Sequence, residues 1–330
     1  MTKHYTLVTG GAGFIGSHVS EYLLQNRYNV VVLDDLSGGF RENVPSSATF
    51  VHGSITNESL VKEIFQTYSI DHIFHLAAYA AENLSHFIRK FNYENNIIGS
   101  INLINAAILH NVKCFVFTSS IAAYGDIPSP MKEEDRPSPC DPYGIAKLAV
   151  EQDLRAAHEL FGLNHVIFRP HNVYGERQNM EDKYRNVVTI FTNQLLQGKP
   201  VTIFGDGMQT RSFSYVGDVA RTIAHAVDVP TAYNKTFNIG SDEVISVRSL
   251  ADLIAQKLNV SPTIQSLKER KEVKHAHADH TLVREILDYK TTTPLDTGIK
   301  HTIAWAKQAG IRKTAEFTHI EIRKQLPEGW

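Results

Sequence analysis

The chain contains very little cysteine. Of its 330 residues only Cys114 and Cys140 are cysteine, too few for a disulfide framework or a cysteine-based zinc site. Such low usage is typical of proteins from a reducing compartment. The sequence also lacks any run near the roughly 18 apolar residues of a membrane helix, and its first residues lead into a strand-like segment without the apolar region of a signal peptide. We therefore predict a soluble, cytoplasmic protein that contacts no membrane.

An excess of one charge is missing as well. Lysine and arginine total 33 and aspartate and glutamate total 35, so the formal net charge is -2. A balance this close to neutral gives no electrostatic reason to expect nucleic acid as a partner. Histidine is frequent, with 16 residues, and alternation would place His275, His277 and Asp279 on one face of an extended segment. No fourth ligand follows at a recognisable spacing, so we predict no metal site.

Length and hydrophobic patterning predict a two-lobed α/β protein. The hydrophobic content of 42% over 330 residues is enough for two lobes, and strand-like runs alternate with segments of helical periodicity, as in parallel βαβ units. The strand-like runs are 30–33, 72–76, 114–117 and 165–168, and the helical segments are 17–24, 58–65, 96–109 and 145–160. We predict a Rossmann-type doubly wound parallel sheet with a smaller α/β C-terminal lobe. The predicted sheet domain is 1–170 with a returning segment 212–240, and the second lobe is 171–211 with 241–330; the tail from residue 320 onward suggests no role.

A glycine-rich turn follows the first strand-like run. It reads TGGAGFIG and places Gly10, Gly13 and Gly16 between a strand and an apolar helix. Such a turn lets the backbone approach a pyrophosphate, whose charge is stabilised at a helix N-terminus. Asp34 ends the second strand-like run, at about the spacing of 20 residues expected for an acid that binds the adenosine ribose and repels a 2′-phosphate. With Asp35 beside it, this arrangement predicts NAD rather than NADP, although such glycines also serve ordinary turns and Asp34 could be a turn residue at a strand end.

Tyr143 and Lys147 suggest acid–base chemistry on an alcohol. They lie four residues apart in a predicted helix and therefore share one face. A phenol's reference pKa of about 10 is too high for a base at neutral pH, but a neighbouring ammonium lowers it. Ser120 follows a strand-like run, so its hydroxyl would lie at the carboxyl end of the sheet and could bind the reacting oxygen. Taken singly, the tyrosine is equally a buried aromatic and the lysine a solvated helix residue; their joint placement after a dinucleotide fold predicts catalysis.

Several ordered motifs together resemble one protein family. They are the glycine turn at 9–16, HLAA at 75–78, NIIGS at 96–100, SSIAAYG at 119–125, Tyr143 with Lys147, and GDGMQTR at 205–211. The sequence resembles the extended short-chain dehydrogenase/reductase family, and within it the NAD-dependent nucleotide-sugar epimerases and dehydratases. This resemblance implies a catalytic triad of Ser120, Tyr143 and Lys147, with tightly held NAD that oxidises and then re-reduces the sugar. The cofactor-binding residues that we predict are Gly10, Gly13, Phe14, Ile15, Gly16, Asp34, Asp35, Ser54, Ile55, Leu76, Ala77, Ala78, Asn96, Tyr143 and Lys147.

The same resemblance implies a nucleotide-sugar site under the second lobe. Asn172 resembles the family's substrate-contacting asparagine, Arg211 its diphosphate-binding arginine, and Arg270 is the nearest candidate for a second arginine. The predicted substrate-binding residues are Glu82, Ser120, Tyr143, Asn172, Arg211 and Arg270. The family also implies a homodimer joined by helices near 96–110 and 145–161, although the apolar residues there equally suit packing against the sheet.

One departure from the family pattern discriminates between reactions. The 4,6-dehydratases of the family carry an Asp-Glu pair after the catalytic hydroxyl, where this chain has Ile121 and Ala122. Neither side chain can exchange a proton, so the resemblance favours epimerisation at C4 of a nucleotide-linked hexose of the UDP-glucose/UDP-galactose type, through a transient 4-keto sugar. The alternatives are a UDP-glucuronate or UDP-N-acetylhexosamine 4-epimerase, or a nucleotide-sugar dehydrogenase, reductase or decarboxylase. The intact triad disfavours a non-catalytic NAD-binding protein.

Overall fold

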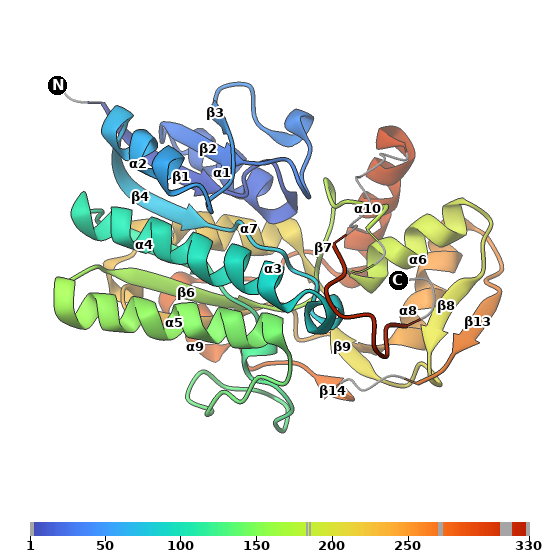
Figure 1. Cartoon of the computed structure of the whole chain (residues 1–330). Helices are drawn as coiled ribbons and strands as arrows, with labels where there is room; N and C mark the ends of the chain where they lie inside the picture. The colour runs from blue at the N-terminus through green and yellow to red at the C-terminus, as the bar shows by residue number, and fades with distance from the viewer. Residues whose placement is uncertain (1–2, 183, 185, 270–272, 311–318, 328–330) are drawn as a thin grey trace.

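A seven-stranded sheet forms the centre of the structure, a computed structural model that describes residues 3–182, 184, 186–269, 273–310 and 319–327. Every neighbouring pair of strands is parallel, and the order is β11-β6-β5-β4-β1-β2-β3 (Figure 1). The strands are β1 (His4–Thr9), β2 (Val30–Asp34), β3 (Thr49–His52), β4 (Ser69–His75), β5 (Cys114–Thr118), β6 (His165–Pro170) and β11 (Lys235–Ile239). The strand order reverses between β1 and β4, which is the point where open α/β sheets bind ligands, at the carboxyl ends of the strands.

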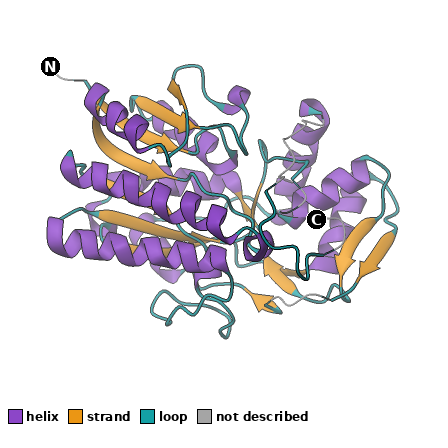
Figure 2. Ribbon diagram, viewed as in Figure 1, coloured by secondary structure: helices purple, strands orange, loops and turns teal. Residues whose placement is uncertain are grey.

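Helices cover both faces of the sheet (Figure 2). Side chains alternate along each strand, so Val8 and Val32 pack with residues of α1, α7 and α9, whereas Leu7 and Val31 pack with α2, α4 and α5. The helices are α1 (Phe14–Gln25), α2 (Glu58–Thr67), α4 (Gly99–Leu109), α5 (Pro142–Phe161), α7 (Val216–His225) and α9 (Thr281–Leu287). A short helix, α3 (Arg89–Tyr93), and a π-helical turn (Glu94–Ile98) lead directly into α4. The predicted doubly wound α/β fold is confirmed.

A second, smaller lobe has its own apolar core. Phe191, Leu250 and Ile299 are buried there and come from α6 (Val187–Leu196), α8 (Val247–Leu258) and α10 (Leu295–Ala309). Its short strands pair as β8 (Val201–Phe204) with β13 (Ile264–Leu267), β9 (Thr210–Ser212) between β12 (Val244–Ser246) and β14 (His275–Ala276), and β10 (Ser214–Tyr215) with β7 (Val173–Tyr174). Between these elements the chain passes through α7 and β11, which belong to the layers of the large sheet. The domain boundaries themselves stay a prediction.

No helix in the described part of the chain is long and apolar enough to cross a membrane. The same residues contain no group of three or more histidines, cysteines or carboxylates that could hold a metal ion. His275, which the alternating histidine pattern singled out, lies within 2.8 Å of the Thr210 hydroxyl through its Nδ1.

Candidate active site

The glycine turn after β1 is shaped so that only glycine fits it. Gly10 has a φ of 72°, and a β-carbon there would lie 2.6 Å from the backbone nitrogen of Ala77. A β-carbon on Gly16 would lie 2.1 Å from the carbonyl oxygen of Gly10. The turn leads into α1, whose N-cap is Gly13, and it opens beside the point where the strand order reverses. A bare backbone and a helix N-terminus at this point fit the pyrophosphate of a dinucleotide.

Asp34 lies at the end of β2 and is 8% exposed. Its two carboxylate oxygens accept hydrogen bonds from the backbone nitrogens of Ala12, at 3.0 Å, and Leu36, at 2.8 Å. Burial raises the pKa of Asp34, and these backbone donors oppose the rise. The carboxylate is therefore held in place next to the glycine turn, where a ribose hydroxyl would be expected. Asp35 is exposed and accepts a bond from the Ser37 nitrogen at 2.9 Å.

The loop after β3 carries two of the residues that are predicted to bind the cofactor. Gly53 donates to the Asp34 carbonyl at 3.0 Å, which places Ser54 and Ile55 beside the end of β2. The Ser54 hydroxyl shares a hydrogen bond of 2.9 Å with the Thr56 hydroxyl, two residues later in the same turn. Ile55 is buried.

Asn96 holds the loop that follows β4. It is 2% exposed, accepts from the Tyr79 nitrogen at 2.8 Å and donates to the Tyr79 carbonyl at 3.1 Å and to Asn92 Oδ1 at 2.8 Å. Both amide hydrogens of Asn96 are used in these bonds. Asn96 thus fixes the loop that carries Leu76, Ala77 and Ala78, and its direct contact with the cofactor stays a prediction.

Tyr143 and Lys147 lie buried in the first two turns of α5. Asp141 caps this helix by accepting from the Gly144 nitrogen at 2.9 Å, and the helix begins with a proline, as is favourable at its first position. Tyr143 is 8% and Lys147 3% exposed. The ammonium donates to the carbonyl of Thr118, the last residue of β5, at 2.7 Å, and lies 5.8 Å from the centre of the Tyr143 ring. The structure therefore brings together the two residues whose joint placement predicted catalysis.

The environment of Lys147 makes its charge sensitive to its neighbours. Burial lowers the pKa of Lys147 to about 7, and the carboxylate of Glu151 opposes this shift. The ammonium also lies 4.8 Å from the centre of the Phe117 ring. His75 stacks against the same ring, with 5.6 Å between the two ring centres. Burial lowers the pKa of His75 to about 3, so this imidazole adds no positive charge beside the ammonium.

Ser120 lies just beyond the end of β5. Its hydroxyl oxygen accepts from the Ala122 nitrogen at 3.1 Å and thereby caps a turn of 3₁₀ helix (Ile121–Ala123). Because it acts there as an acceptor, its O–H group is left to donate to a ligand oxygen. Tyr143, Lys147 and Ser120 all lie at the carboxyl edge of the sheet, as the predicted triad requires.

A buried ionic network behind Lys147 was missed by sequence reasoning. Glu151 is fully buried and accepts two bonds from Arg169, at 2.9 and 2.5 Å, and one from the Ser119 hydroxyl at 2.6 Å. Arg169 is 1% exposed, and its guanidinium lies 4.4 Å from the centre of the Tyr124 ring. Two signals could have revealed the pair: Glu151 lies four residues after Lys147 on the same helix face, and an arginine interrupts an otherwise apolar strand.

The predicted substrate residues are only partly brought together. Asn172 has a φ of 43° and donates to the Ser212 carbonyl at 3.0 Å, which places it beside β9. Arg211 lies in β9 and donates to the carbonyls of Thr210, at 2.8 Å, and Lys274, at 3.2 Å. Of the other predicted substrate residues, Ser120 and Tyr143 lie at the carboxyl edge of the sheet, Glu82 is exposed on the loop before α3, and Arg270 lies outside the described residues.

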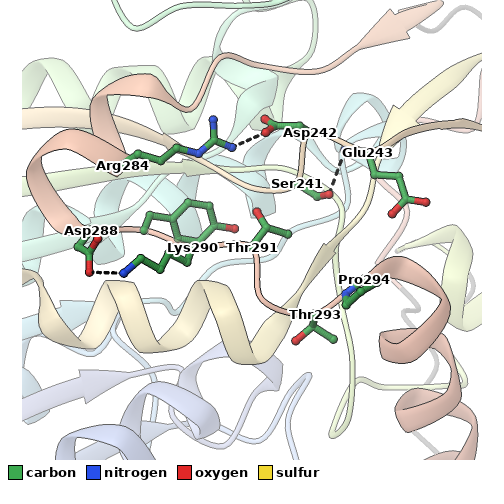
Figure 3. Close-up of a pocket in the computed structure, with 10 residues that line it drawn as sticks. Ser241, Asp242, Glu243, Arg284, Asp288, Lys290, Thr291, Thr293 and Pro294 are labelled. Carbon is green, nitrogen blue, oxygen red and sulfur yellow. Dashed lines mark hydrogen bonds and ion pairs between the residues drawn. The ribbon is translucent and has the colours of Figure 1, made fainter.

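The pocket in Figure 3 is a different feature. It has a volume of about 620 Å³ and lies among the residues that follow β11 and those that precede α10. Its basic residues are engaged, Arg284 with Asp242 and Lys290 with Asp288. None of the predicted site residues lines it, and those of the triad lie at the carboxyl edge of the sheet.

Known proteins resemble this chain over most of its length. A sequence model of the NAD dependent epimerase/dehydratase family matches residues 6–240. UDP-glucose 4-epimerase of Mycolicibacterium smegmatis is 35% identical over 306 residues, 90% of this chain and 97% of that protein. The structure of UDP-glucose 4-epimerase from Thermotoga maritima with UDP-glucose shares 36% identity and a TM-score of 0.89, over 92% of this chain and 99% of that one. UDP-glucuronic acid 4-epimerase from Bacillus cereus, solved with UDP-glucuronic acid and NAD, shares 30% identity and a TM-score of 0.86, over 93% and 100%.

The fold and these comparisons define an enzyme of the short-chain dehydrogenase/reductase class. The chain belongs to the NAD-dependent epimerase/dehydratase family, since the family model covers most of it and relatives above 30% identity match nearly its whole length. This confirms the predicted family and its cofactor, NAD. Among the relatives the sugar in the name differs.

Proposed function

We propose that the protein interconverts C4 epimers of a UDP-linked hexose, with UDP-glucose and UDP-galactose as the favoured pair. The observation that carries the proposal is the buried Tyr143–Lys147 pair at the carboxyl edge of the sheet, next to Ser120 and without a carboxylate in the two positions that follow it. Such a site can move one proton at the reacting hydroxyl and has no acid–base pair for neighbouring carbons.

The glycine turn after β1 and Asp34 would hold NAD, which would supply the hydride acceptor and donor for C4 of the sugar. The chain's own residues handle the proton and the geometry. Tyr143, as the phenolate, accepts the proton of the C4 hydroxyl, and the Lys147 ammonium stabilises the phenolate by its charge. Lys147 is held for this role by the Thr118 carbonyl, 2.7 Å from its nitrogen. Ser120 donates to the reacting oxygen, and Tyr143 gives the proton back when the alcohol reforms.

Ile121 and Ala122 argue against elimination of water. A 4,6-dehydration needs a base at C5 and an acid at C6, and an aliphatic side chain can be neither. Both residues lie in the 3₁₀ turn that Ser120 caps. They therefore follow directly after the serine that is proposed to bind the reacting oxygen. The 4-keto sugar is therefore expected to be reduced again rather than dehydrated.

The sugar is the finer part of the proposal. Relatives with 35% and 36% identity carry the name UDP-glucose 4-epimerase, which supports a neutral hexose. A UDP-glucuronate or UDP-N-acetylhexosamine substrate is the alternative, and relatives of about 30% identity include enzymes named for each. The roles of Asn172 and Arg211 in holding the nucleotide diphosphate are proposed on the family resemblance.

The test is to incubate the purified chain, with no added cofactor, with UDP-linked glucose, galactose, N-acetylglucosamine, N-acetylgalactosamine and glucuronate, and to follow each by proton NMR. The proposal expects the C4 epimer of glucose or galactose to accumulate without net NADH. Tyr143→Phe, which removes only the phenolic oxygen, should abolish the conversion while the purified protein keeps its NAD. Net NADH formation or release of carbon dioxide would instead identify a dehydrogenase or a decarboxylase.

We also propose a homodimer formed through α4 and α5. These helices lie side by side (Figure 1), and several large apolar side chains on them are exposed in the single chain. The most exposed are Leu109 at 74%, Leu160 at 75% and Phe161 at 60%. An exposed apolar patch of this kind is typical of an interface. Light scattering should give twice the chain mass, and Leu160→Glu should reduce it to that of one chain. The cytoplasmic location remains a prediction.

A further inference from the structure

The C-terminal residues 319–327, which we call the C-terminal strap, pack against the segment between β4 and α4. The backbone nitrogens of Glu321 and Ile322 donate to the Phe87 carbonyl at 2.9 and 3.1 Å. Ile320 packs against a small apolar cluster built on Ala81, Leu84 and Ile88. Figure 1 shows the strap in dark red beside α3, although it follows α10 in the sequence. The last part of the chain thus covers a loop more than 200 residues earlier.

Glu321 caps α3. Its two carboxylate oxygens accept from the backbone nitrogens of Lys90 and Phe91, each at 2.8 Å. These nitrogens belong to the first turn of the helix, where no earlier carbonyl of the same helix is available. Ile88, the residue at the N-cap position, makes no capping bond with its side chain. Glu321 therefore supplies from a distance the acceptor that the local sequence lacks, and its charge matches the positive end of the helix dipole.

The capped segment in turn holds the first turn of the catalytic helix α5. Asn92, in α3, is fully buried and donates to the Pro142 carbonyl at 2.9 Å. Ser85, in the 3₁₀ turn before α3, accepts a hydrogen bond from the backbone nitrogen of Tyr143 at 3.2 Å. Hydrogen bonds on both sides of this segment thus connect Glu321 to the backbone that carries the Tyr143 phenol.

We propose that Glu321 is a positioning residue, which acts through α3 and the preceding turn to hold Tyr143 against Lys147. The proposal rests on the function proposed above and adds the C-terminal strap to its site. Nothing in the main cores depends on the strap: the large apolar clusters on the two faces of the sheet and in the second lobe contain none of its residues. Loss of the strap should therefore loosen the first turn of α5 while the remaining fold persists.

The test compares Glu321→Ala with Glu321→Asp and with the control Lys324→Ala in the full chain. Lys324 is an exposed residue of the same strap. Two properties are measured: hydrogen–deuterium exchange of peptides that cover 85–96 and 142–147, and kcat and KM for the UDP-sugar that the wild type converts. Loss of a helix cap typically shifts the equilibrium for local opening of the helix by about fivefold. We expect exchange in both peptides to rise by about fivefold in Glu321→Ala, and kcat to fall by a similar factor with KM within about twofold.

Glu321→Asp keeps both carboxylate oxygens and should restore most of kcat, and Lys324→Ala should match the wild type. The NAD content and the main unfolding transition should be the same in all four proteins. Unchanged exchange at 142–147 in Glu321→Ala, or a loss of kcat that aspartate does not restore, would overturn the proposal. The exchange measurement needs no substrate. If the wild type epimerises no UDP-sugar but exchange at 142–147 still rises in Glu321→Ala, the proposed function is refuted and the link from Glu321 to Tyr143 stands.

Discussion

Replacing Glu151 by glutamine tests the buried network that supports the active site. Glu151 is fully buried, Arg169 is 1% exposed, and the two share hydrogen bonds of 2.9 and 2.5 Å. Removing the negative charge leaves the guanidinium buried without a counter-ion. One of its nitrogens, Nη1, already has no hydrogen-bond partner among the described residues.

Breaking a buried ion pair by removing one partner costs about 3–5 kcal/mol. Glutamine retains one carbonyl oxygen for Arg169, so we take the lower end, a loss of about 3 kcal/mol in the free energy of unfolding. With an unfolding entropy of about 2.1 cal/mol/K per residue, this loss lowers the melting temperature of a 330-residue chain by about 4 °C. The assay is urea and thermal unfolding of both proteins at one fixed, saturating NAD concentration, because bound cofactor shifts the midpoint.

Two controls make the measurement specific. Glu159→Gln removes the same charge from an exposed position on the same helix and should change stability by less than about 0.5 kcal/mol. The double variant Glu151→Leu/Arg169→Met removes both charges of the pair and should be more stable than Glu151→Gln, since no buried guanidinium is left without its carboxylate. A loss below about 1 kcal/mol in Glu151→Gln, or a double variant less stable than the single one, would refute the reasoning.

Three further results are expected. Lys147→Met should lower the epimerisation rate by at least about 10²-fold while the protein keeps its NAD, because the Tyr143 phenolate then lacks the neighbouring ammonium. NMR measures the rate, and absorbance of the released cofactor measures the NAD content. Burial lowers the pKa of His75 to about 3, so between about pH 6.5 and 3 the unfolded chain binds a proton there that the folded chain does not. The free energy of unfolding should therefore fall by a few kcal/mol as the pH is lowered through this window. His75→Gln should flatten this part of the pH dependence, as measured by urea unfolding. In fluorescence titrations, Asp34→Asn should weaken NAD binding by about tenfold and reduce the preference for NAD over NADP. An unchanged preference for NAD would show that Asp34 does not contact the ribose.

The fold could be predicted from the sequence because the sequence signals that indicate it are local. Strands that are apolar on both faces, as at Val31 and Val32, indicate a sheet covered on both sides, and the glycine turn lies next to the strand that it follows. Tyr143 and Lys147 could be paired for the same reason, since four residues in a helix bring two side chains together.

Contacts between distant segments could not be predicted in this way. Glu151 meets Arg169 only because β6 lies beside the strand that precedes α5 in the sheet, and Glu321 reaches α3 over 230 residues. The cofactor contact predicted for Asn96 stays a prediction, and the structure adds that its amide hydrogens hold Tyr79 and Asn92. A motif indicates that a residue matters, but the partners of its polar atoms become visible only in three dimensions.

The most direct test of the account follows the hydrogen on the reacting carbon. Purified protein with its own NAD is given UDP-glucose deuterated at C4, and the product is examined by proton and deuterium NMR. If hydride leaves C4 and returns to the same carbon while Tyr143 handles only the hydroxyl proton, UDP-galactose will carry deuterium at C4 and no NADH will accumulate. Loss of the label to water, or its accumulation in reduced cofactor without an epimer, would contradict the account.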